Sequence, residues 1–232
     1  MIDKIISELQ QFSPYSIFLY GSRGRNDNKA DSDYEVGVVF EDEKVIRRSE
    51  IHEKIQLDSV RIYPFKLSEI RTGVLDTPFV NSIYLRELVE GGRTISGSKV
   101  VETLTPQPIT SLDLIRRVRF DIGYALAAIL SSRTGDTETT HEEFSKSCLF
   151  GLRTLIIVRL GIFVSGYDKI YALRDKVVSN AEHLAVIEAA YSLRNGAEKI
   201  DGNLLFDNIS FLDYVENEVL AVLDEKGIVA LV

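Results

Sequence analysis

The sequence predicts an α+β fold in two parts, a small β-sheet flanked by helices followed by an all-helical bundle. Apolar runs at residues 16–20 and 36–40 have the length of strands, and a stretch rich in Gly, Ser, Arg and Asp joins them. Beyond Pro108 the pattern changes, because apolar residues there recur at helical spacing. The sheet is therefore expected in the first part of the chain and the bundle in the second.

The elements of the first part follow from apolar spacing and from proline and glycine stops. A helical period ends at Ser13-Pro14, a strand pattern ends at Pro64, and a longer helical pattern ends at Gly91-Gly92. We therefore predict helices at residues 2–12, 41–55 and 67–91, and strands at residues 16–20, 36–40, 56–63 and 93–97. Val45, Ile51 and Ile55 form the apolar thread of the second helix.

A proline-rich segment separates the two parts. Pro106 and Pro108 stand two apart, which favours extended chain and breaks both helix and sheet. We place the domain boundary here, with a first domain at residues 1–105 and a helical, substrate-binding domain at residues 106–232. Five helices are predicted in the second domain, at residues 112–131 (capped by Ser111), 141–160 (ended by Gly161), 167–178, 181–193 and 209–223.

The composition indicates a soluble protein. Of its 232 residues, 45% are apolar and 27% charged. The most apolar stretch, Cys148 to Gly166, contains two arginines, which argues against a membrane span. The first residues lack the regions of a signal peptide, and a single cysteine excludes an internal disulfide, so we expect a cytoplasmic location.

The net charge bears on the class of partner. It is −8, whereas a protein that binds duplex nucleic acid usually shows a basic face. An acidic total suits a small-molecule enzyme, or one that attracts a cationic substrate. The sequence leaves open whether the protein forms a homodimer.

The polar stretch between the first two strands carries the chemistry. Gly21 lets the backbone come close to a ligand, and Ser22 adds a hydroxyl suited to phosphate. Asp33 and Glu35 stand two apart at the mouth of the second strand, so their side chains point the same way. Two such carboxylates favour a hard cation such as Mg²⁺, completed by substrate phosphates.

These residues resemble the signature of the nucleotidyltransferase superfamily, the DNA polymerase β-like proteins. Gly21-Ser22 is followed ten residues on by Ser32-Asp33-x-Glu35, and the minimal and antibiotic nucleotidyltransferases share this pattern. The resemblance implies a small mixed sheet, with Gly21, Ser22 and Arg25 on the triphosphate and Asp33 and Glu35 on Mg²⁺, two ions being expected. Asn26 stands where these proteins often have Gly, and Glu35 where most have Asp, although the kanamycin nucleotidyltransferases also use Asp-x-Glu.

The resemblance also implies a third carboxylate and a catalytic base. Asp58, on the predicted third strand, is the match by position for a metal ligand or base, and a strand-edge acid that blunts pairing is the alternative. Arg61 could instead face the site and contact phosphate. The kanamycin enzymes take their base from the first helix of the second domain, where Asp121 is the candidate. Arg116, Arg117 and Arg119 on that helix are expected on a solvated face.

A second resemblance lies in the helical part. Leu152-Arg153, Gly161 and Val164-Ser165 are similar to the C-terminal domain of aminoglycoside adenylyltransferases, which continue with Lys where this chain has Gly166. The resemblance implies that Arg153 contacts the nucleotide, and a structural ion pair inside the bundle is the alternative.

Taken together, the sequence predicts a Mg²⁺-dependent nucleotidyltransferase. A nucleoside monophosphate, AMP from ATP being the first candidate, would pass to a hydroxyl of a small, aminoglycoside-like molecule, and pyrophosphate would leave. The alternatives are an antitoxin-type enzyme that places AMP on a protein, and a non-catalytic nucleotide-binding module. The sequence contains no P-loop motif, and three scattered histidines with one cysteine predict no zinc site.

Overall fold

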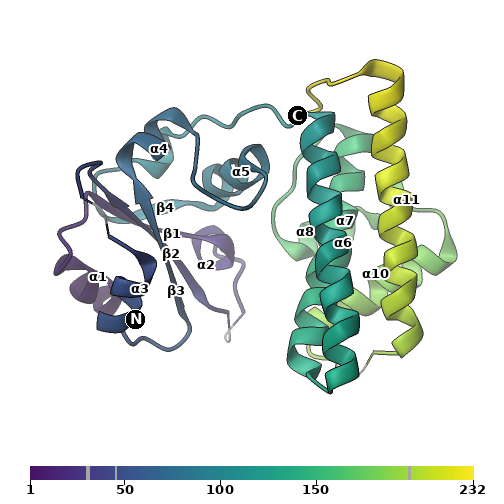
Figure 1. Ribbon diagram of the computed structural model, residues 1–232, viewed down its shortest axis with the longest axis horizontal. Helices are drawn as coiled ribbons and strands as arrows, with labels where there is room; N and C mark the ends of the chain where they lie inside the picture. The colour runs from purple at the N-terminus through teal and green to yellow at the C-terminus, as the bar shows by residue number, and fades with distance from the viewer. Residues whose placement is uncertain (30–31, 45, 198–199) are drawn as a thin grey trace. The chain divides into compact units, whose positions relative to one another are not determined.

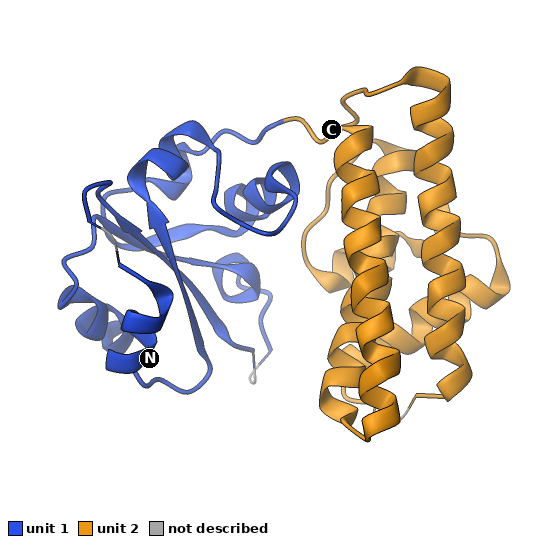
Figure 2. Ribbon diagram, viewed as in Figure 1, with its two compact units in different colours: residues 1–107 blue, residues 108–232 orange. Residues whose placement is uncertain are grey.

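The protein folds into two compact units, Met1–Gln107 and Pro108–Val232, coloured separately in Figure 2. The structure, a computed structural model, describes residues 1–29, 32–44, 46–197 and 200–232. The predicted boundary between residues 105 and 106 lies two residues before this division. Each unit has its own hydrophobic core.

A mixed four-stranded sheet forms the centre of the first unit, in the order β3-β2-β1-β4. Its strands are β1 (Ser16–Tyr20), β2 (Tyr34–Phe40), β3 (Val60–Lys66) and β4 (Arg93–Gly97). β1 pairs antiparallel with β2 and β4, whereas β2 and β3 run parallel. The mixed α+β architecture predicted from the sequence is confirmed.

Helices cover both faces of this sheet, as Figure 1 shows. On one face α1 (Ile2–Gln10) and α3 (Arg48–Lys54) pack on alternate residues of the strands. On the other face lie α4 (Leu67–Thr72) and α5 (Asn81–Gly91). Phe18, Tyr20 and Val39 point to this second face. Side chains alternate along a strand, so Glu35, four residues before Val39 on β2, points to the same face.

Two predicted helices of the first unit are shorter than the apolar spacing indicated. The helix predicted at residues 41–55 is reduced to α3, and Val45 of its apolar thread lies outside the described residues. The helix predicted at residues 67–91 is divided into α4 and α5. Gly73 ends α4 in the left-handed region with φ 67°, a conformation that favours glycine and stops a helix.

The third strand begins later than predicted and continues through its proline. β3 starts at Val60 rather than at residue 56, so Asp58 lies in the turn that precedes it. Pro64 lies within β3, which is an edge strand. Proline is tolerated there because its missing N–H costs the sheet no hydrogen bond. The predicted stop at Pro64 is therefore wrong.

The second unit consists mainly of long antiparallel helices, and Figure 1 shows α6, α7, α10 and α11 side by side. The helices predicted at residues 112–131, 141–160 and 209–223 are longer than expected, and the one predicted at residues 167–178 is divided into α8 and α9. The helices are α6 (Ser111–Thr134), α7 (Thr137–Leu160), α8 (Tyr167–Ala172), α9 (Arg174–Val177), α10 (Ala181–Arg194) and α11 (Gly202–Lys226). Gly161 ends α7 with φ 64°, as predicted.

Side-chain caps set where the long helices begin. Thr110, rather than the predicted Ser111, caps α6: its hydroxyl accepts from the Asp113 N–H, and the Asp113 carboxylate accepts from the Thr110 N–H at 3.0 Å. Asp136 caps α7 with its carboxylate, which accepts the Thr139 N–H at 3.0 Å, so that helix begins at Thr137 and not at residue 141.

The two ends of the second unit are joined by backbone hydrogen bonds. The Ile109 N–H donates to the Val232 carbonyl and the Leu231 N–H donates back to Ile109, both at 2.9 Å. Thr110 and Ala230 form an antiparallel bridge between them. The start of the unit and the last residues of the chain therefore form a short two-stranded ladder.

None of the helices in the described part of the chain combines the length and apolar character required to cross a membrane.

Candidate functional site

The turn between β1 and β2 brings a backbone and a carboxylate into close contact. Tyr20 and Glu35 are register partners, so the chain leaves β1 at Gly21 directly beside the Glu35 side chain. A Cβ on Gly21 would lie 1.7 Å from Glu35 Oε2, and φ at this residue is +63°. Only glycine fits here, for reasons of both space and backbone conformation.

A one-turn helix follows immediately. α2 (Gly21–Arg25) packs against α5 so closely that a Cβ on Gly24 would lie 1.9 Å from the Gly91 carbonyl oxygen. Asn26 ends α2 in the left-handed conformation with φ 62°. This is the position where the resemblance expected Gly, and Asn is the residue that best replaces it in that conformation.

Arg23 holds the loop that carries Asp33. Its Nε and Nη2 donate to the Ser32 carbonyl at 3.1 and 2.8 Å, and its guanidinium lies 4.2 Å from the centroid of the Tyr34 ring. The loop is thus fixed on both sides of Asp33. Sequence reasoning did not identify this role.

Arg61 lies beside both candidate metal ligands. It is the register partner of Glu35 on the parallel strand β3, so the two side chains leave the same face of the sheet. Its Nε donates to Asp33 Oδ2 at 3.0 Å. The structure therefore brings Asp33, Glu35 and Arg61 together.

Three tyrosines border Glu35 on the same face. The Tyr20 ring lies 5.9 Å from Tyr63 and 6.3 Å from Tyr84 between centroids, and the Tyr84 hydroxyl donates to that of Tyr20 at 3.3 Å. Burial raises the pKa of the Tyr20 hydroxyl well above its usual range, and the negative charge of Glu35 raises it further. Burial also raises the pKa of Tyr84, so both phenols stay protonated near the carboxylate.

Arg25 and Ser22 differ in their surroundings. Arg25 Nε is paired with Asp27 Oδ2 at 2.9 Å, and its side chain is only 15% exposed, packed beside Gly91. Ser22 stands at the second position of α2, and its carbonyl accepts the N–H of Asp27 at 3.0 Å. The predicted phosphate contacts of both residues stay predictions.

Asp58 is exposed in the turn before β3. The next residue, Ser59, accepts the Tyr34 N–H at 2.7 Å, so this turn lies at the same end of the sheet as Asp33. Its predicted place on a strand is wrong, but the parallel pairing of β2 and β3 brings it to the same edge of the sheet as Asp33.

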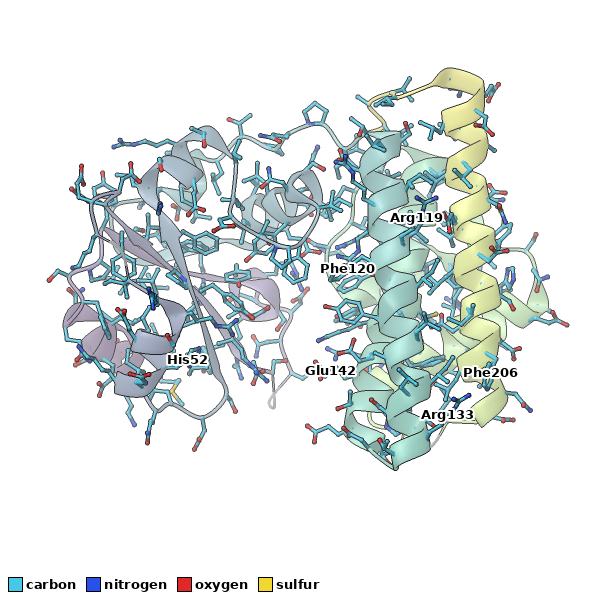
Figure 3. All side chains as sticks on the ribbon, in the orientation of Figure 1. His52, Arg119, Phe120, Arg133, Glu142 and Phe206 are labelled. Atoms are coloured by element: carbon cyan, nitrogen blue, oxygen red, sulfur yellow. The ribbon has the colours of Figure 1, made fainter. Side chains whose placement is uncertain are left out.

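Asp121 forms a buried ion pair in the second unit. Arg117 donates to it from Nε at 3.0 Å and from Nη2 at 2.7 Å, and the two side chains are 8% and 0% exposed. Arg117 is therefore not on the solvated face that the sequence predicted. Arg119, labelled on α6 in Figure 3, is by contrast exposed, and it pairs with Glu216 of α11.

Arg153 is buried close to this pair. It is 2% exposed, and its guanidinium lies 4.6 Å from the centroid of Phe150 and 5.1 Å from that of Phe163. The Arg117 guanidinium lies 4.5 Å from the same Phe150 ring. Of the other residues in this resemblance, Ser165 is also buried.

Asp33 and Glu35 offer two carboxylates to a magnesium ion. Among residues 1–29, 32–44, 46–197 and 200–232, no three or more His, Cys, Asp and Glu side chains converge on one point. Two carboxylates do suffice for Mg²⁺ when substrate phosphates and water supply the other oxygens. The residues present thus fit a magnesium ion that arrives with a phosphate ligand, and not a metal cage made by the protein alone.

Residues 2–83 match the family model of the nucleotidyltransferase domain, a range that includes β1, α2, β2 and β3. Among curated proteins, none matches the chain in sequence.

One solved structure is similar over nearly the whole chain. It is spectinomycin adenyltransferase AAD(9) from Enterococcus faecialis, crystallised with ATP and spectinomycin. The TM-score is 0.59 at 16% identity, with 94% of this chain and 98% of that chain covered. At this identity the likeness concerns the fold, and it extends over both units.

Proposed function

We propose that the protein, whose residues 2–83 match the family model of the nucleotidyltransferase domain, transfers a nucleoside monophosphate from a nucleoside triphosphate to a hydroxyl of a small molecule. The observation that carries the proposal is the contact between Gly21 and Glu35, with Asp33 held next to them. The backbone of this turn and the two carboxylates form a site suited to phosphate and a divalent cation.

The reaction requires the acceptor hydroxyl to attack the α-phosphorus while the bond to the β-phosphate oxygen breaks and pyrophosphate leaves. Asp33 and Glu35 would hold Mg²⁺. When bound, this ion neutralises charge on the phosphates. The backbone N–H groups of Gly21 and Ser22 would lie along the β- and γ-phosphates.

Several residues of the chain support this arrangement without touching the nucleotide. Arg23 fixes the Ser32 carbonyl and so orients Asp33. The Tyr84 hydroxyl donates to that of buried Tyr20, and both phenols remain neutral near Glu35. We propose Asp58, exposed at the same edge, as the residue that accepts the proton of the attacking hydroxyl.

Asp121 was expected to act as the base and Arg153 to contact the nucleotide, but their surroundings in the second unit favour structural roles. Both oxygens of Asp121 already accept from Arg117, so a role as base would need that buried pair to open. Arg153 is stacked among phenylalanines. We propose that both residues maintain the bundle of the second unit.

The acceptor is proposed from fold similarity. AAD(9) was crystallised with spectinomycin and shares its fold with both units of this chain. The net charge of −8 would attract a cationic acceptor. We therefore propose a small polyhydroxylated amine as the acceptor and ATP as the first donor to test.

The experiment incubates the chain with each α-labelled nucleoside triphosphate and Mg²⁺, with spectinomycin, an aminoglycoside panel or a cell lysate. Label on a small molecule supports the proposal, whereas label on a protein identifies a protein-modifying enzyme. Glu53→Gln, an exposed acid on α3, is the matched control for Asp33→Asn. If Asp33→Asn retains turnover, the site is wrongly assigned.

A second candidate function, a nucleotide-binding module without turnover, is favoured by one observation. Asp33 is already paired with the guanidinium of Arg61. Binding of nucleotide with no transfer to any acceptor would select this alternative.

A further inference from the structure

We propose that Arg61 is an exchangeable cation of the candidate site. In the nucleotide-free protein it holds Asp33, and the phosphates of an incoming nucleotide draw it away so that Asp33 can bind a divalent cation. This inference rests on the proposed function, because it assigns the order in which phosphate and metal enter the same site.

The position of Arg61 is the first argument. β2 and β3 are parallel neighbours, and Arg61 faces Glu35 across them in register. The same side chain reaches Asp33, two residues before Glu35, with its Nε at 3.0 Å from Oδ2. A positive charge of the protein's own therefore stands where the two carboxylates would receive a metal ion.

The exposure of the pair is the second argument. The side chains of Arg61 and Asp33 are 60% and 40% exposed. Water screens an ion pair of this kind, so it contributes little to stability and separates readily. The fold does not depend on Arg61 remaining with Asp33.

The chemistry of the guanidinium group is the third argument. Arginine keeps its charge at all physiological pH values, and its planar donors match phosphate as well as they match carboxylate. Phosphates carry more negative charge than one aspartate, so a nucleotide bound along Gly21 and Ser22 would compete for it.

A thermodynamic consequence follows. A metal ion that binds alone must displace Arg61 from Asp33, and this lowers the affinity of the metal. Bound phosphate has already drawn Arg61 away, so the metal no longer has to displace it. Phosphate and metal then bind with positive cooperativity, and each raises the affinity of the other by the same factor. Removing the guanidinium should change the two single affinities in opposite directions.

The test measures two binding equilibria for the full chain and its variants. Free Mn²⁺ is followed by electron paramagnetic resonance without any phosphate, and inorganic tripolyphosphate is titrated calorimetrically in the presence of EDTA. Tripolyphosphate carries the phosphates common to all nucleoside triphosphates, so the result does not depend on the base. Lys4→Gln, an exposed residue of α1, removes one positive charge elsewhere in the same unit.

We expect Arg61→Gln to bind Mn²⁺ about three- to tenfold more tightly than the wild type, because a partly exposed opposing charge has gone. The same variant should bind tripolyphosphate about tenfold more weakly. Lys4→Gln should change neither affinity by more than about twofold, since its charge is distant and screened. A role of Arg61 in folding alone would not give effects of opposite sign.

Two results would overturn the inference. One is an unchanged or weaker Mn²⁺ affinity in Arg61→Gln, and the other is an unchanged tripolyphosphate affinity. Both leave the proposed function standing if label transfer and its loss in Asp33→Asn are observed. Absence of Mn²⁺ binding in every variant, with or without tripolyphosphate, would contradict the inference and the metal site together.

Discussion

Two arginine–aspartate pairs, one in each unit, differ in almost every physical property. Arg61 and Asp33 are separated by 28 positions in sequence and are largely exposed. Arg117 and Asp121 are four apart on one helix turn and almost fully buried. The comparison predicts that removal of one partner costs little stability in solvent, and much more in a core, where it leaves a buried charge without its counterion.

The largest expected effect concerns the exposed pair and function. Asp33→Asn should lower nucleotidyl transfer roughly a thousandfold or more, because the cation then loses one of its two carboxylates. The free energy of unfolding should change by less than about 1 kcal/mol, as for other exposed pairs. Rates from pyrophosphate release and stability from urea titration test both halves.

A large loss of stability in Asp33→Asn would break the comparison, because the exposed pair would then be structural. Glu53→Gln serves as the control, with turnover and stability expected to match the wild type.

The next effect concerns the buried pair and stability. Asp121→Asn leaves the Arg117 charge buried without its carboxylate, and should destabilise the second unit by about 3–5 kcal/mol. Cys148 is a suitable reporter: it is fully buried in this unit, and burial raises the pKa of its thiol, so alkylation requires opening.

The double variant Arg117→Met with Asp121→Leu provides the matched test. It removes both charges while keeping comparable volume, and should recover most of the lost stability. Equal alkylation rates of Cys148 in Asp121→Asn and the wild type would show that the pair is not structural.

A smaller effect is expected at the turn that carries the site. Gly21→Ala introduces a Cβ 1.7 Å from Glu35 Oε2 at a residue with φ +63°. The strain should cost about 1–3 kcal/mol of stability, and Mn²⁺ affinity should fall as Glu35 moves. Gly135→Ala is the control, since that residue has a similar φ of +78° but no atom within 4 Å.

If the two alanine variants lose equal stability and equal metal affinity, the contact with Glu35 has no role beyond backbone strain.

The smallest effect belongs to a third pair, on the surface of the second unit. Arg119 and Glu216 join α6 and α11 at 2.7 Å, with Arg119 62% exposed. Arg119→Gln should change stability by about 0.2–1 kcal/mol, measured by the same urea titration. A loss as large as that of Asp121→Asn would mean that burial does not distinguish the pairs.

The sequence predicted those features that depend on neighbours along the chain. Gly21, Asp33 and Glu35 belong to one short stretch between two strands, and their spacing alone indicated a phosphate and metal site. The stop at Gly161 was likewise predictable, because a glycine after a long apolar period marks a helix end.

The features that it did not predict depend on pairing between distant strands or on burial. The contact of Arg61 with Asp33 follows from the parallel register of β2 and β3, which apolar patterns do not specify. Arg117 and Asp121 stand at the i, i+4 spacing of a helical ion pair, so the sequence does contain a signal for this bond, although not for its burial. Gly73 and Pro78 similarly marked the break between α4 and α5.

The ladder that joins the ends of the second unit has a mechanical consequence. Ile109 and Val232 lie at the same end of the ladder, so a force applied through Pro108 and Val232 peels its hydrogen bonds one at a time. Hydrogen bonds that bear the force one after another break at low force, whereas hydrogen bonds that share the force break only at a higher one. Stretching of single molecules from these two points should show an early, small extension before the helices separate.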